Sequence, residues 1–343
     1  MPPKTSRTSF VNSGSVVAAS ALAFVGTAAA LWVNHRARVA EREHPPTGQF
    51  IEIEGVRLHY LEQGTGPPVV LLHGNGVQSE DFIASGLFDK LAQRHRVIAF
   101  DRPGFGYSDR PRGRIWTPRL QALLLSKAIN QLSAMRPVVV AHSWGTLVAL
   151  AMGLQTPAEI GALVLLSGYY HPTARLDAPL NIPGAIPGVG DVLQHTALPV
   201  LARVGLKRAL RKMFAPAQIP ENFFSVIPRE LMLRPKQLRA AAEDTALMIP
   251  AVTLMRSEYS RLRPPVVLFA GTDDGIVDSG AQTVRLHKEV AGSQLHMVPT
   301  GHMLHYAAVN EIANAVASLS EDPVSSSELL SVAQEVEGNP IDS

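Results

Sequence analysis

The chain of 343 residues is 46% hydrophobic and 17% charged. It is long enough to bury a full core, either as one large α/β domain with an insertion or as two domains. The formal net charge of +2 gives no reason to expect nucleic acid as a partner. The absence of cysteine excludes disulfides, thiolate metal sites and cysteine nucleophiles.

The N-terminal region contains an apolar run without charges, "VVAASALAFVGTAAALWV" (16–33), with Lys4 and Arg7 before it and Arg36 after it. A membrane-spanning helix needs about 20 mostly apolar residues, with a lower limit near 17. Residues 1–45 are therefore predicted to form a single-pass N-terminal membrane anchor and its linker. The alternative is a secretory signal cleaved near "TAAA", which gives a secreted or periplasmic protein. Because basic residues flank both ends, they do not set the orientation.

The central region alternates between two kinds of pattern. Alternating apolar and polar residues in 50–64 predict a hairpin of two strands. Apolar runs predict further strands at 67–74, 96–101, 137–142, 162–168, 264–271 and 294–299. Helical spacing covers 80–93, 118–134, 144–156, about 279–290 and about 304–319. This alternation predicts an α/β fold, a mostly parallel sheet flanked by helices, built from 46–170 and 263–320.

Residues 171–262 interrupt this rhythm. The segment is rich in proline, has no clear strand and includes the amphipathic stretch "PVLARVGLKRALRKMF" (199–214). We predict a helical cap, or lid, inserted between two strands of the sheet. The basic face of 199–214 is typical of a solvated helix, and beside a membrane anchor it also suits contact with lipid. Residues 321–343 hold six acidic residues and no basic one, which is typical of a solvated tail.

Ser143, in "VVVAHSWGTLVAL" (138–150), stands between a predicted strand and a predicted helix. One interpretation is a helix N-cap, since a serine hydroxyl can accept a bond from a free backbone N–H. The other is a nucleophile, because Ala141 and Gly145 are small enough for a sharp strand-to-helix turn that exposes the serine. A nucleophilic serine also needs a base and an orienting acid.

Candidates for that base and acid follow the last two predicted strands. Asp273 and Asp274 come just after 264–271, and His302 comes just after 294–299. The chain order Ser, Asp, His is the one found with this kind of turn. All three positions lie at the carboxyl ends of strands, where open α/β sheets place their sites.

Five motifs together resemble the α/β-hydrolase fold family over residues 46–320. They are "LLHGNG" (71–76), "DRPGFGYSD" (101–109), "AHSWG" (141–145), "GTDD" (271–274) and "GHMLH" (301–305). The resemblance implies that Ser143 is the nucleophile, Asp274 the orienting acid and His302 the general base. Asp274 is preferred to Asp273 because family members place the acid three residues after the glycine that ends the strand. Asp273 and Asp278 suit turn and N-cap positions.

The same resemblance implies an oxyanion hole, in which backbone donors stabilise the negative charge of a tetrahedral intermediate. We expect the backbone N–H of Trp144 and that of Asn75 to form it, with Gly76 as the alternative to Asn75. His73 is expected to be a structural residue of the loop. The pair His302 and His305 has helical spacing for a metal, but no third ligand is in view, so no metal or other cofactor is expected.

The resemblance therefore implies a serine hydrolase that forms an acyl-enzyme, with a small-molecule or lipid-like carboxylic ester as the expected substrate. Ser143 argues against the dehalogenases and epoxide hydrolases of the family, which need a carboxylate nucleophile. Aminopeptidase, C–C bond hydrolase and perhydrolase activities share the triad and remain alternatives. A non-catalytic binding protein on the same scaffold is a further alternative, since fold does not fix function.

Overall fold

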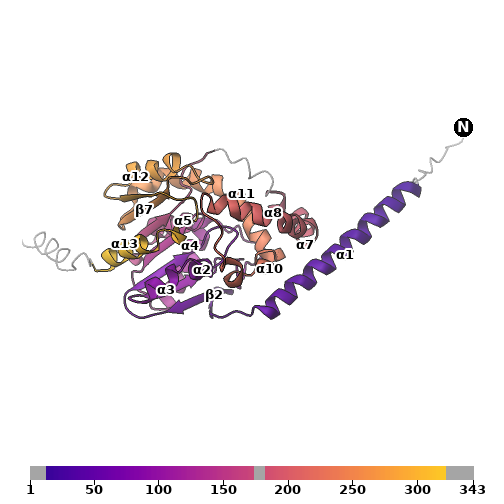
Figure 1. The fold of residues 1–343 in the computed structure, drawn as a ribbon, viewed down its shortest axis with the longest axis horizontal. Helices are drawn as coiled ribbons and strands as arrows, with labels where there is room; N and C mark the ends of the chain where they lie inside the picture. The colour runs from indigo at the N-terminus through magenta and orange to yellow at the C-terminus, as the bar shows by residue number, and fades with distance from the viewer. Residues whose placement is uncertain (1–12, 174–181, 322–343) are drawn as a thin grey trace, which may run out of the picture.

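The computed structural model describes residues 13–173 and 182–321. Within them, eight strands form one sheet in the order β1-β2-β4-β3-β5-β6-β7-β8 (Figure 1). The strands are β1 (Gln49–Ile53), β2 (Val56–Gln63), β3 (Pro68–Leu72), β4 (Arg96–Phe100), β5 (Val138–His142), β6 (Ala162–Leu166), β7 (Val266–Gly271) and β8 (Gln294–Val298). β2 pairs antiparallel with β1 and with β4, and the other neighbours are parallel. The predicted mostly parallel sheet is confirmed.

The register follows from the hydrophobic pattern and from one tight turn. Glu54 and Gly55 connect β1 to β2 with φ values of 51° and 75°, as a two-residue hairpin turn requires. This turn pairs Ile53 with Val56. Every residue of β5 is buried, because the strand has neighbours on both sides and helices on both faces. The central strands therefore present their carboxyl ends at one rigid edge.

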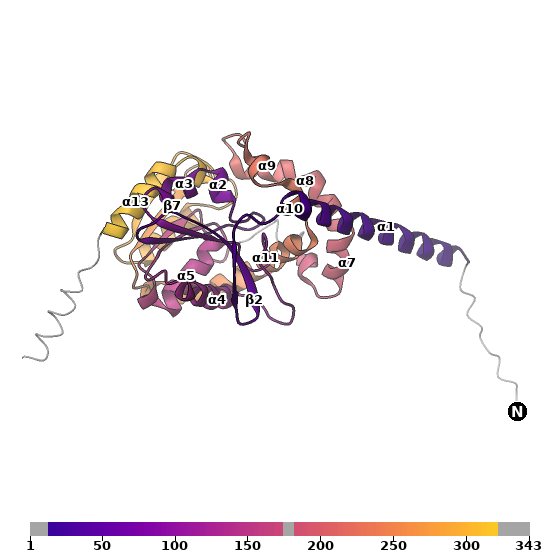
Figure 2. The same ribbon diagram turned by 90° about the horizontal axis from the view of Figure 1, so that it is seen from below.

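Helices cover both faces of the sheet (Figure 2). Val69 and Leu71 of β3 belong to the core that includes residues of α2, α3 and α13, whereas Val70 and Leu72 belong to the core that includes residues of α4, α5 and α12. The helices are α2 (Asp81–Ala84), α3 (Leu87–Ala92), α4 (Pro118–Gln131), α5 (Gly145–Gln155), α12 (Arg285–Glu289) and α13 (Val309–Glu321). Successive side chains of a strand point to opposite faces, so each inner strand binds both layers.

Three of the expected helices differ in detail. The helix predicted over 80–93 is broken between α2 and α3, where Gly86 takes a left-handed φ of 78°. The helix expected near 279 begins as one π-helical turn, Gly280–Val284, before α12. A 3₁₀ turn, Leu304–Tyr306, precedes α13. The acidic tail beyond Glu321 lies outside the described residues.

Between β6 and β7 the described residues form only helices and loops. They are η2 (Ile182–Ala185), α7 (Val189–His195), α8 (Ala197–Phe214), α9 (Phe223–Val226), α10 (Arg229–Met232), α11 (Pro235–Met255) and η3 (Arg256–Arg261). We call this segment the cap. Its apolar side chains Leu210, Phe214 and Phe223 pack with Val77 and Met303 of the core loops, so the cap covers the carboxyl edge of the sheet.

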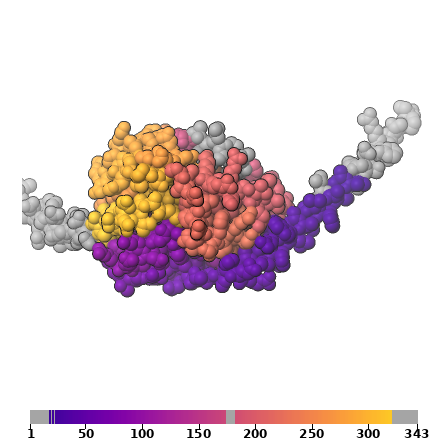
Figure 3. All heavy atoms as spheres, viewed as in Figure 1, coloured from indigo at the N-terminus to yellow at the C-terminus, as the bar shows by residue number. Residues whose placement is uncertain are grey.

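The N-terminal helix α1 (Ser13–Glu43) continues past the predicted apolar run and replaces the predicted linker. Its last part packs on the cap, where Val33 and Ala40 are buried. Arg36 lies 3.2 Å from Glu230 of the cap. This part of α1 contacts α7, α10 and α11 of the cap. The earlier part of α1 projects beyond the body of the molecule (Figure 3). Of the helices in the described residues, none has the length and apolar character needed to cross a membrane.

Candidate active site

Ser143 occupies the sharp turn between β5 and α5. Its φ of 50° is left-handed, a conformation that costs a residue with a side chain about 1–2 kcal/mol. The backbone around it is fixed, since Ser143 N–H donates to Leu166 O at 2.8 Å and Thr146 N–H donates to Ser143 O at 3.1 Å. The residue at the N-cap position of α5 is Trp144, and the Ser143 hydroxyl bonds to His302. The structure therefore replaces the N-cap interpretation with a turn that presents Ser143 Oγ.

The small residues predicted from the sequence are required by close backbone contacts at this turn. A Cβ on Gly145 would lie 2.5 Å from Leu72 O and 2.7 Å from His73 O. A Cβ on Gly74 would lie 3.2 Å from the Cβ of Ser143. Ala141, where the motif has its first glycine, is fully buried in β5. These contacts hold the turn in place and keep its strained conformation.

The structure brings Ser143, His302 and Asp274 together. His302 Nε2 lies 2.9 Å from Ser143 Oγ, and His302 Nδ1 lies 2.8 Å from Asp274 Oδ2. Since an ionised carboxylate only accepts hydrogen bonds, Nδ1 donates to it and Nε2 is left to accept the serine proton. The His302 and Asp274 side chains are almost completely buried, so this relay is shielded from water.

Asp274 is held in its ionised form. Burial acts to raise its pKa, but the hydrogen bond and charge of His302 and the N–H donors of Val277 and Ile276 outweigh burial, and the pKa falls below the ordinary value. Asp273 is exposed and accepts a bond from its neighbour Thr272 at 3.1 Å. Asp278 accepts from Ala281 N–H at 2.9 Å, as an N-cap does. The acid in contact with the histidine is thus Asp274, the residue that the sequence favoured.

The predicted oxyanion residues line the same cavity as the serine. Asn75, Gly76 and Trp144 border it together with Ser143 and His302. Trp144 directly precedes α5, at the end of the helix where backbone N–H groups lack helical partners. That these N–H groups bind an oxyanion stays a prediction.

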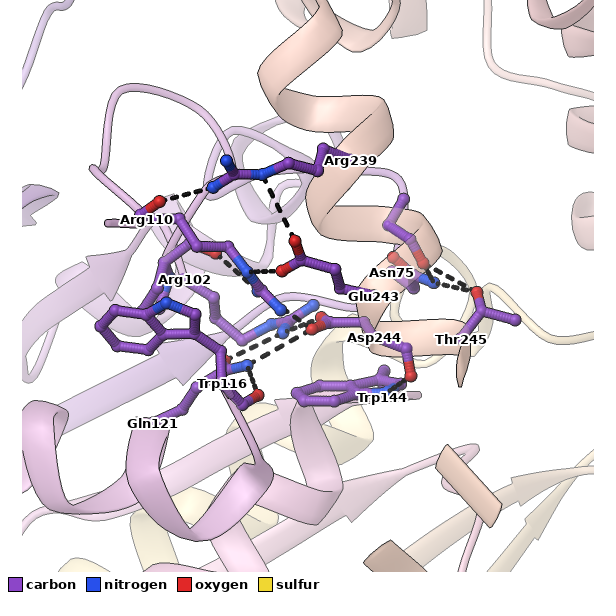
Figure 4. Close-up of polar contacts among 12 residues, drawn as sticks. Asn75, Arg102, Arg110, Trp116, Gln121, Trp144, Arg239, Glu243, Asp244 and Thr245 are labelled. Carbon is purple, nitrogen blue, oxygen red and sulfur yellow. Dashed lines mark hydrogen bonds and ion pairs between the residues drawn. The ribbon is translucent and has the colours of Figure 1, made fainter. Parts of the chain in front are cut away.

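A buried ion network connects the cap to this site (Figure 4). Arg102 Nη1 lies 2.7 Å from Asp244 Oδ2 of α11, and Arg110 Nη1 lies 3.1 Å from Asp244 Oδ1. All three side chains have at most 1% exposure. Arg102 also donates to the carbonyls of His73 and Gly74 at 2.9 and 3.0 Å. The Asp244 carboxylate therefore connects the cap helix to the loop after β4. Arg102 in turn connects that loop to the loop after β3.

The oxyanion candidates are attached to the same helix. The indole N–H of Trp144 donates to Asp244 O at 2.9 Å. The Asn75 amide donates to Ala241 O and to Thr245 Oγ1, each at 3.1 Å (Figure 4). Sequence reasoning missed these contacts. The available signal was weak, a charged pair in the helical stretch "AAAEDTALM", because exposed helices carry such pairs too.

His73 is structural, as expected. Its Nδ1–H donates to Gly74 O at 2.7 Å and its Nε2 accepts from Arg102 N–H at 2.9 Å. One neutral tautomer satisfies both bonds. Burial, together with the charge of Arg102, lowers the pKa of His73 to about 3, so this imidazole stays neutral at ordinary pH.

His305 lies behind His302 in a second buried group. Its Nε2 lies 2.9 Å from Asp81 Oδ2, and Tyr306 donates to Asp81 Oδ1 at 2.7 Å. His142 Nε2–H donates to the carbonyl of His302 at 3.1 Å. The ligand atoms of Asp81, His142 and His305 lie within 4.8 Å of one another. Because the Asp81 carboxylate is already satisfied by two donors, we interpret this group as a hydrogen-bond network that supports His302.

The serine hydroxyl opens into a cavity of about 650 Å³ under the cap. Most of its described lining is apolar and comes from α8 and α11. The lining includes Leu198, Leu201, Met213, Leu238 and Met248. Of the described lining residues, Lys212 is the one with a permanent charge. The cavity is thus shaped for a largely apolar group next to a reactive hydroxyl.

The chain belongs to the family described as alpha/beta hydrolase fold, which its residues 67–308 match. Haloalkane dehalogenase 2 of Mycobacterium tuberculosis (strain ATCC 25618 / H37Rv) is 28% identical over 133 residues, 39% of this chain and 46% of the relative. The chain thus spans about half the length of that relative. The 2-hydroxy-6-oxo-2,4-heptadienoate hydrolase of Pseudomonas putida is 24% identical over 274 residues, 77% of this chain and 91% of the relative.

Solved structures share the fold. A hydrolase from Pseudomonas aeruginosa PA01 matches with a TM-score of 0.66 and 20% identity, covering 80% of this chain and 99% of that chain. The enol-lactonase from Burkholderia xenovorans LB400 matches with a TM-score of 0.65 and 18% identity, covering 80% of this chain and 100% of that chain. These likenesses establish the architecture only, and the reaction has to be inferred from the geometry of the site.

The ion network predicts a large loss of stability when its carboxylate is removed. Asp244→Ala should lower the free energy of unfolding by about 3–5 kcal/mol, because the buried Arg102 loses its counter-charge and Arg110 keeps only Glu243. Asp89→Ala, which removes an exposed carboxylate of α3, is the control and should change it by less than about 0.5 kcal/mol. Urea unfolding followed by circular dichroism measures both. Equal losses would show that the network does not hold the cap.

Proposed function

We propose that this protein is a serine hydrolase that cleaves carboxylic esters through an acyl-enzyme. The observation that carries the proposal is the relay from Asp274 through His302 to Ser143, with bonds of 2.8 and 2.9 Å, at the base of the apolar cavity. The family includes hydrolases, in agreement with this chemistry. A nucleophile, a base within hydrogen-bond reach and an orienting acid are the parts that acyl transfer needs.

The geometry gives each residue one role. His302 Nε2 takes the proton of Ser143 as Oγ attacks the ester carbonyl. The tetrahedral oxyanion is stabilised by the backbone N–H groups of Trp144 and Asn75. When the intermediate collapses, His302 returns the proton to the leaving alkoxide, which departs as the alcohol. Water then attacks the acyl-enzyme with His302 again as base, and the carboxylic acid and free Ser143 are released.

An ester with an apolar acyl chain fits the cavity. The side chains from α8 and α11 offer apolar contact, and burial contributes about 0.8 kcal/mol for each CH₂. Among the described lining residues Lys212 is the one permanently charged group, so the cavity offers a single cation beside an otherwise largely apolar surface. These properties favour a neutral, lipid-like acyl substrate.

The second candidate is hydrolysis of a C–C bond. The relative that supports it is the 2-hydroxy-6-oxo-2,4-heptadienoate hydrolase, which aligns with 77% of this chain. A serine, a histidine and an acid serve that reaction as well. The substrate named for that relative carries a carboxylate, however, and the described lining offers Lys212 as its one permanent cation, without an arginine for bidentate binding. We therefore place ester hydrolysis first. A binder without activity would have no need of the complete relay.

Replacement of the nucleophile tests the reaction class. Ser143→Ala should abolish hydrolysis of p-nitrophenyl octanoate and labelling by a fluorophosphonate probe, because both need the Oγ. The fold should remain, since this side chain makes no core contact, and circular dichroism checks it. Thr156→Ala, which alters a hydroxyl at the far end of α5, is the control and should keep both activities. Turnover retained by Ser143→Ala would refute the nucleophile.

The same assay separates the two candidate reactions. The unmodified protein should hydrolyse p-nitrophenyl octanoate faster than a 2-hydroxy-6-oxo-dienoate, whose cleavage is followed by its loss of absorbance. The opposite order would favour C–C bond hydrolysis. Labelling by the fluorophosphonate without turnover of either compound would leave the nucleophile in place and reject both substrates.

The orienting acid can be tested against its neighbour in sequence. Asp274→Asn should lower kcat by up to about 10⁴, the loss seen when the same change fixes the wrong histidine tautomer in a serine protease. Asp273→Asn should have little effect, because that carboxylate is exposed and does not contact His302. Steady-state kinetics on both variants gives the comparison. Equal losses would contradict the assignment of Asp274.

We also propose that the protein is attached to a membrane through α1. The part of α1 before Val33 exposes large apolar side chains: Val17, Phe24, Val25, Leu31 and Trp32 are 43–76% exposed. The cap helix α8 lies beside this part of α1, with the Arg203 guanidinium 5.3 Å from the Trp32 ring. α8 exposes Leu201 and Val204 as well as its basic residues, which suits a surface that meets lipid.

Attachment is tested by carbonate extraction of membranes from cells that express the full chain. The protein should stay in the pellet, and N-terminal sequencing should find a start at or near Met1. A product that is released into the supernatant and starts after Ala30 would contradict attachment. It would support the alternative, a cleaved signal and a secreted or periplasmic enzyme.

A further inference from the structure

A second cleft, with a volume of about 390 Å³, lies where α1 meets the cap. Its walls come from α1, from the loop after β4, from α7 and from the start of α11. In the described residues it shares no lining residue with the cavity at Ser143. The proposed relay at Ser143 therefore does not explain why this cleft is lined by these residues.

The cleft carries an excess of positive charge. Its described lining contains five arginine or lysine side chains and two carboxylates. The cations are Arg110, Arg112, Arg234, Lys236 and Arg239, and the carboxylates are Glu41 and Asp109. Asp109 is also shared with Arg57, 3.8 Å away and outside the cleft lining. Because Glu243, Asp244 and Asp191, which lie outside the lining, pair with three of these arginines, the surplus positive charge that favours an anionic ligand rests on Lys236.

Lys236 is the cation that lacks a counter-charge. The four arginines each lie within ion-pair distance of an acid: Arg110 with Glu243 and Asp244, Arg112 with Asp191, Arg234 with Glu41, and Arg239 with Glu243. Lys236 has no such pair among the described residues, and its ammonium lies 5.4 Å from the centre of the Tyr107 ring. Burial, with the nearby charge of Arg234, lowers the pKa of Lys236 to about 8. An anion beside this ammonium would offset both effects.

One further donor at the cleft lacks an acceptor, and a helix N-terminus lies beside it. Arg110 is 1% exposed, and its Nη2 has no hydrogen-bond partner within the described part of the chain. Buried guanidinium donors are normally satisfied. The helix α11, 21 residues long, also begins here, with Pro235 at its first turn and no side-chain cap from Arg234. The N-terminus of a long helix attracts anions through its free N–H groups and its dipole.

We infer that this cleft binds the phosphate group of a phosphate ester, with Lys236 and Arg110 as its principal donors. A phosphate presents several acceptor oxygens in different directions, and therefore suits donors that arrive from the loop after β4 and from α11 together. Two sources share this chemistry. One is a soluble phosphate ester. The other is a phospholipid headgroup, since Leu31 and Trp32 are exposed on α1 within one turn of Asn34, which lines the cleft.

The first experiment measures binding of inorganic phosphate to the full chain by isothermal titration calorimetry at constant ionic strength. Lys236→Met should weaken binding by about ten- to a hundredfold, as the loss of a charge-assisted hydrogen bond predicts. Lys236→Arg should retain it. Lys90→Met removes an exposed charge on α3, outside the cleft, and should bind like the unmodified protein. Thermal unfolding without phosphate checks that each variant folds.

The second arm uses co-sedimentation with vesicles of phosphatidylcholine alone or mixed with phosphatidic acid. Binding to the mixed vesicles that is lost in Lys236→Met and competed by inorganic phosphate identifies a lipid headgroup as the source. Phosphate binding that depends on Lys236 without such vesicle binding identifies a soluble ester. Both outcomes support the site. If folded Lys236→Met binds phosphate and mixed vesicles as well as Lys90→Met does, the inference is overturned. Neither readout depends on hydrolysis, so the result stands apart from the proposed activity.

Discussion

The arrangement of the cap depends on three charges that are shielded from water. Arg102, Arg110 and Asp244 are at most 1% exposed, and charges in such a place are tolerated only when they are paired and hydrogen-bonded. Asp244 belongs to α11 and the two arginines belong to the loop after β4. Only a few positions of α11 therefore allow Asp244 to pair with both arginines. This requirement fixes α11 over the sheet more specifically than apolar contact does, because apolar contact has no direction.

The shape of the cavity at Ser143 follows from that placement. With α11 fixed, Ala241 and Thr245 receive the Asn75 amide, and the Asp244 carbonyl receives the Trp144 indole. The loops that carry the candidate oxyanion donors are thus attached to the cavity roof. Below them, the strained φ of Ser143 is maintained by the close approach of Gly145 to the carbonyls of Leu72 and His73. Strain at a functional residue persists only where its surroundings are this well determined.

The first helix connects the cap to a different part of the surface. Its C-terminal part is docked through Val33, Ala40 and ion pairs to the cap, whereas its earlier part exposes Phe24, Val25 and Leu31. The basic cleft lies at the boundary between these two parts. A ligand bound there would contact α1 and α11 at once, and α11 is the helix that forms the roof of the catalytic cavity. The cleft and the cavity are therefore joined by one rigid element.

The sequence by itself determined the strands, the approximate helices and the residues of the relay. Buried strands have continuous apolar runs, and the turn at Ser143 needs small neighbours, so both leave local patterns in the chain. The choice of Asp274 over Asp273 rested on family spacing, and contact with His302 in the structure agrees with it. The break at Gly86 was missed because apolar spacing continues across it.

Only the tertiary structure decided how distant segments meet. The pairing of Arg102 with Asp244 joins residues 142 positions apart, and no local pattern distinguishes these charges from solvated ones. The same reason applies to α1, where an apolar run suggested an anchor and linker, but partners on the cap extend the helix to Glu43. Periodicity records which side chains avoid water. Which charge is paired, and with what, depends on the burial that folding creates.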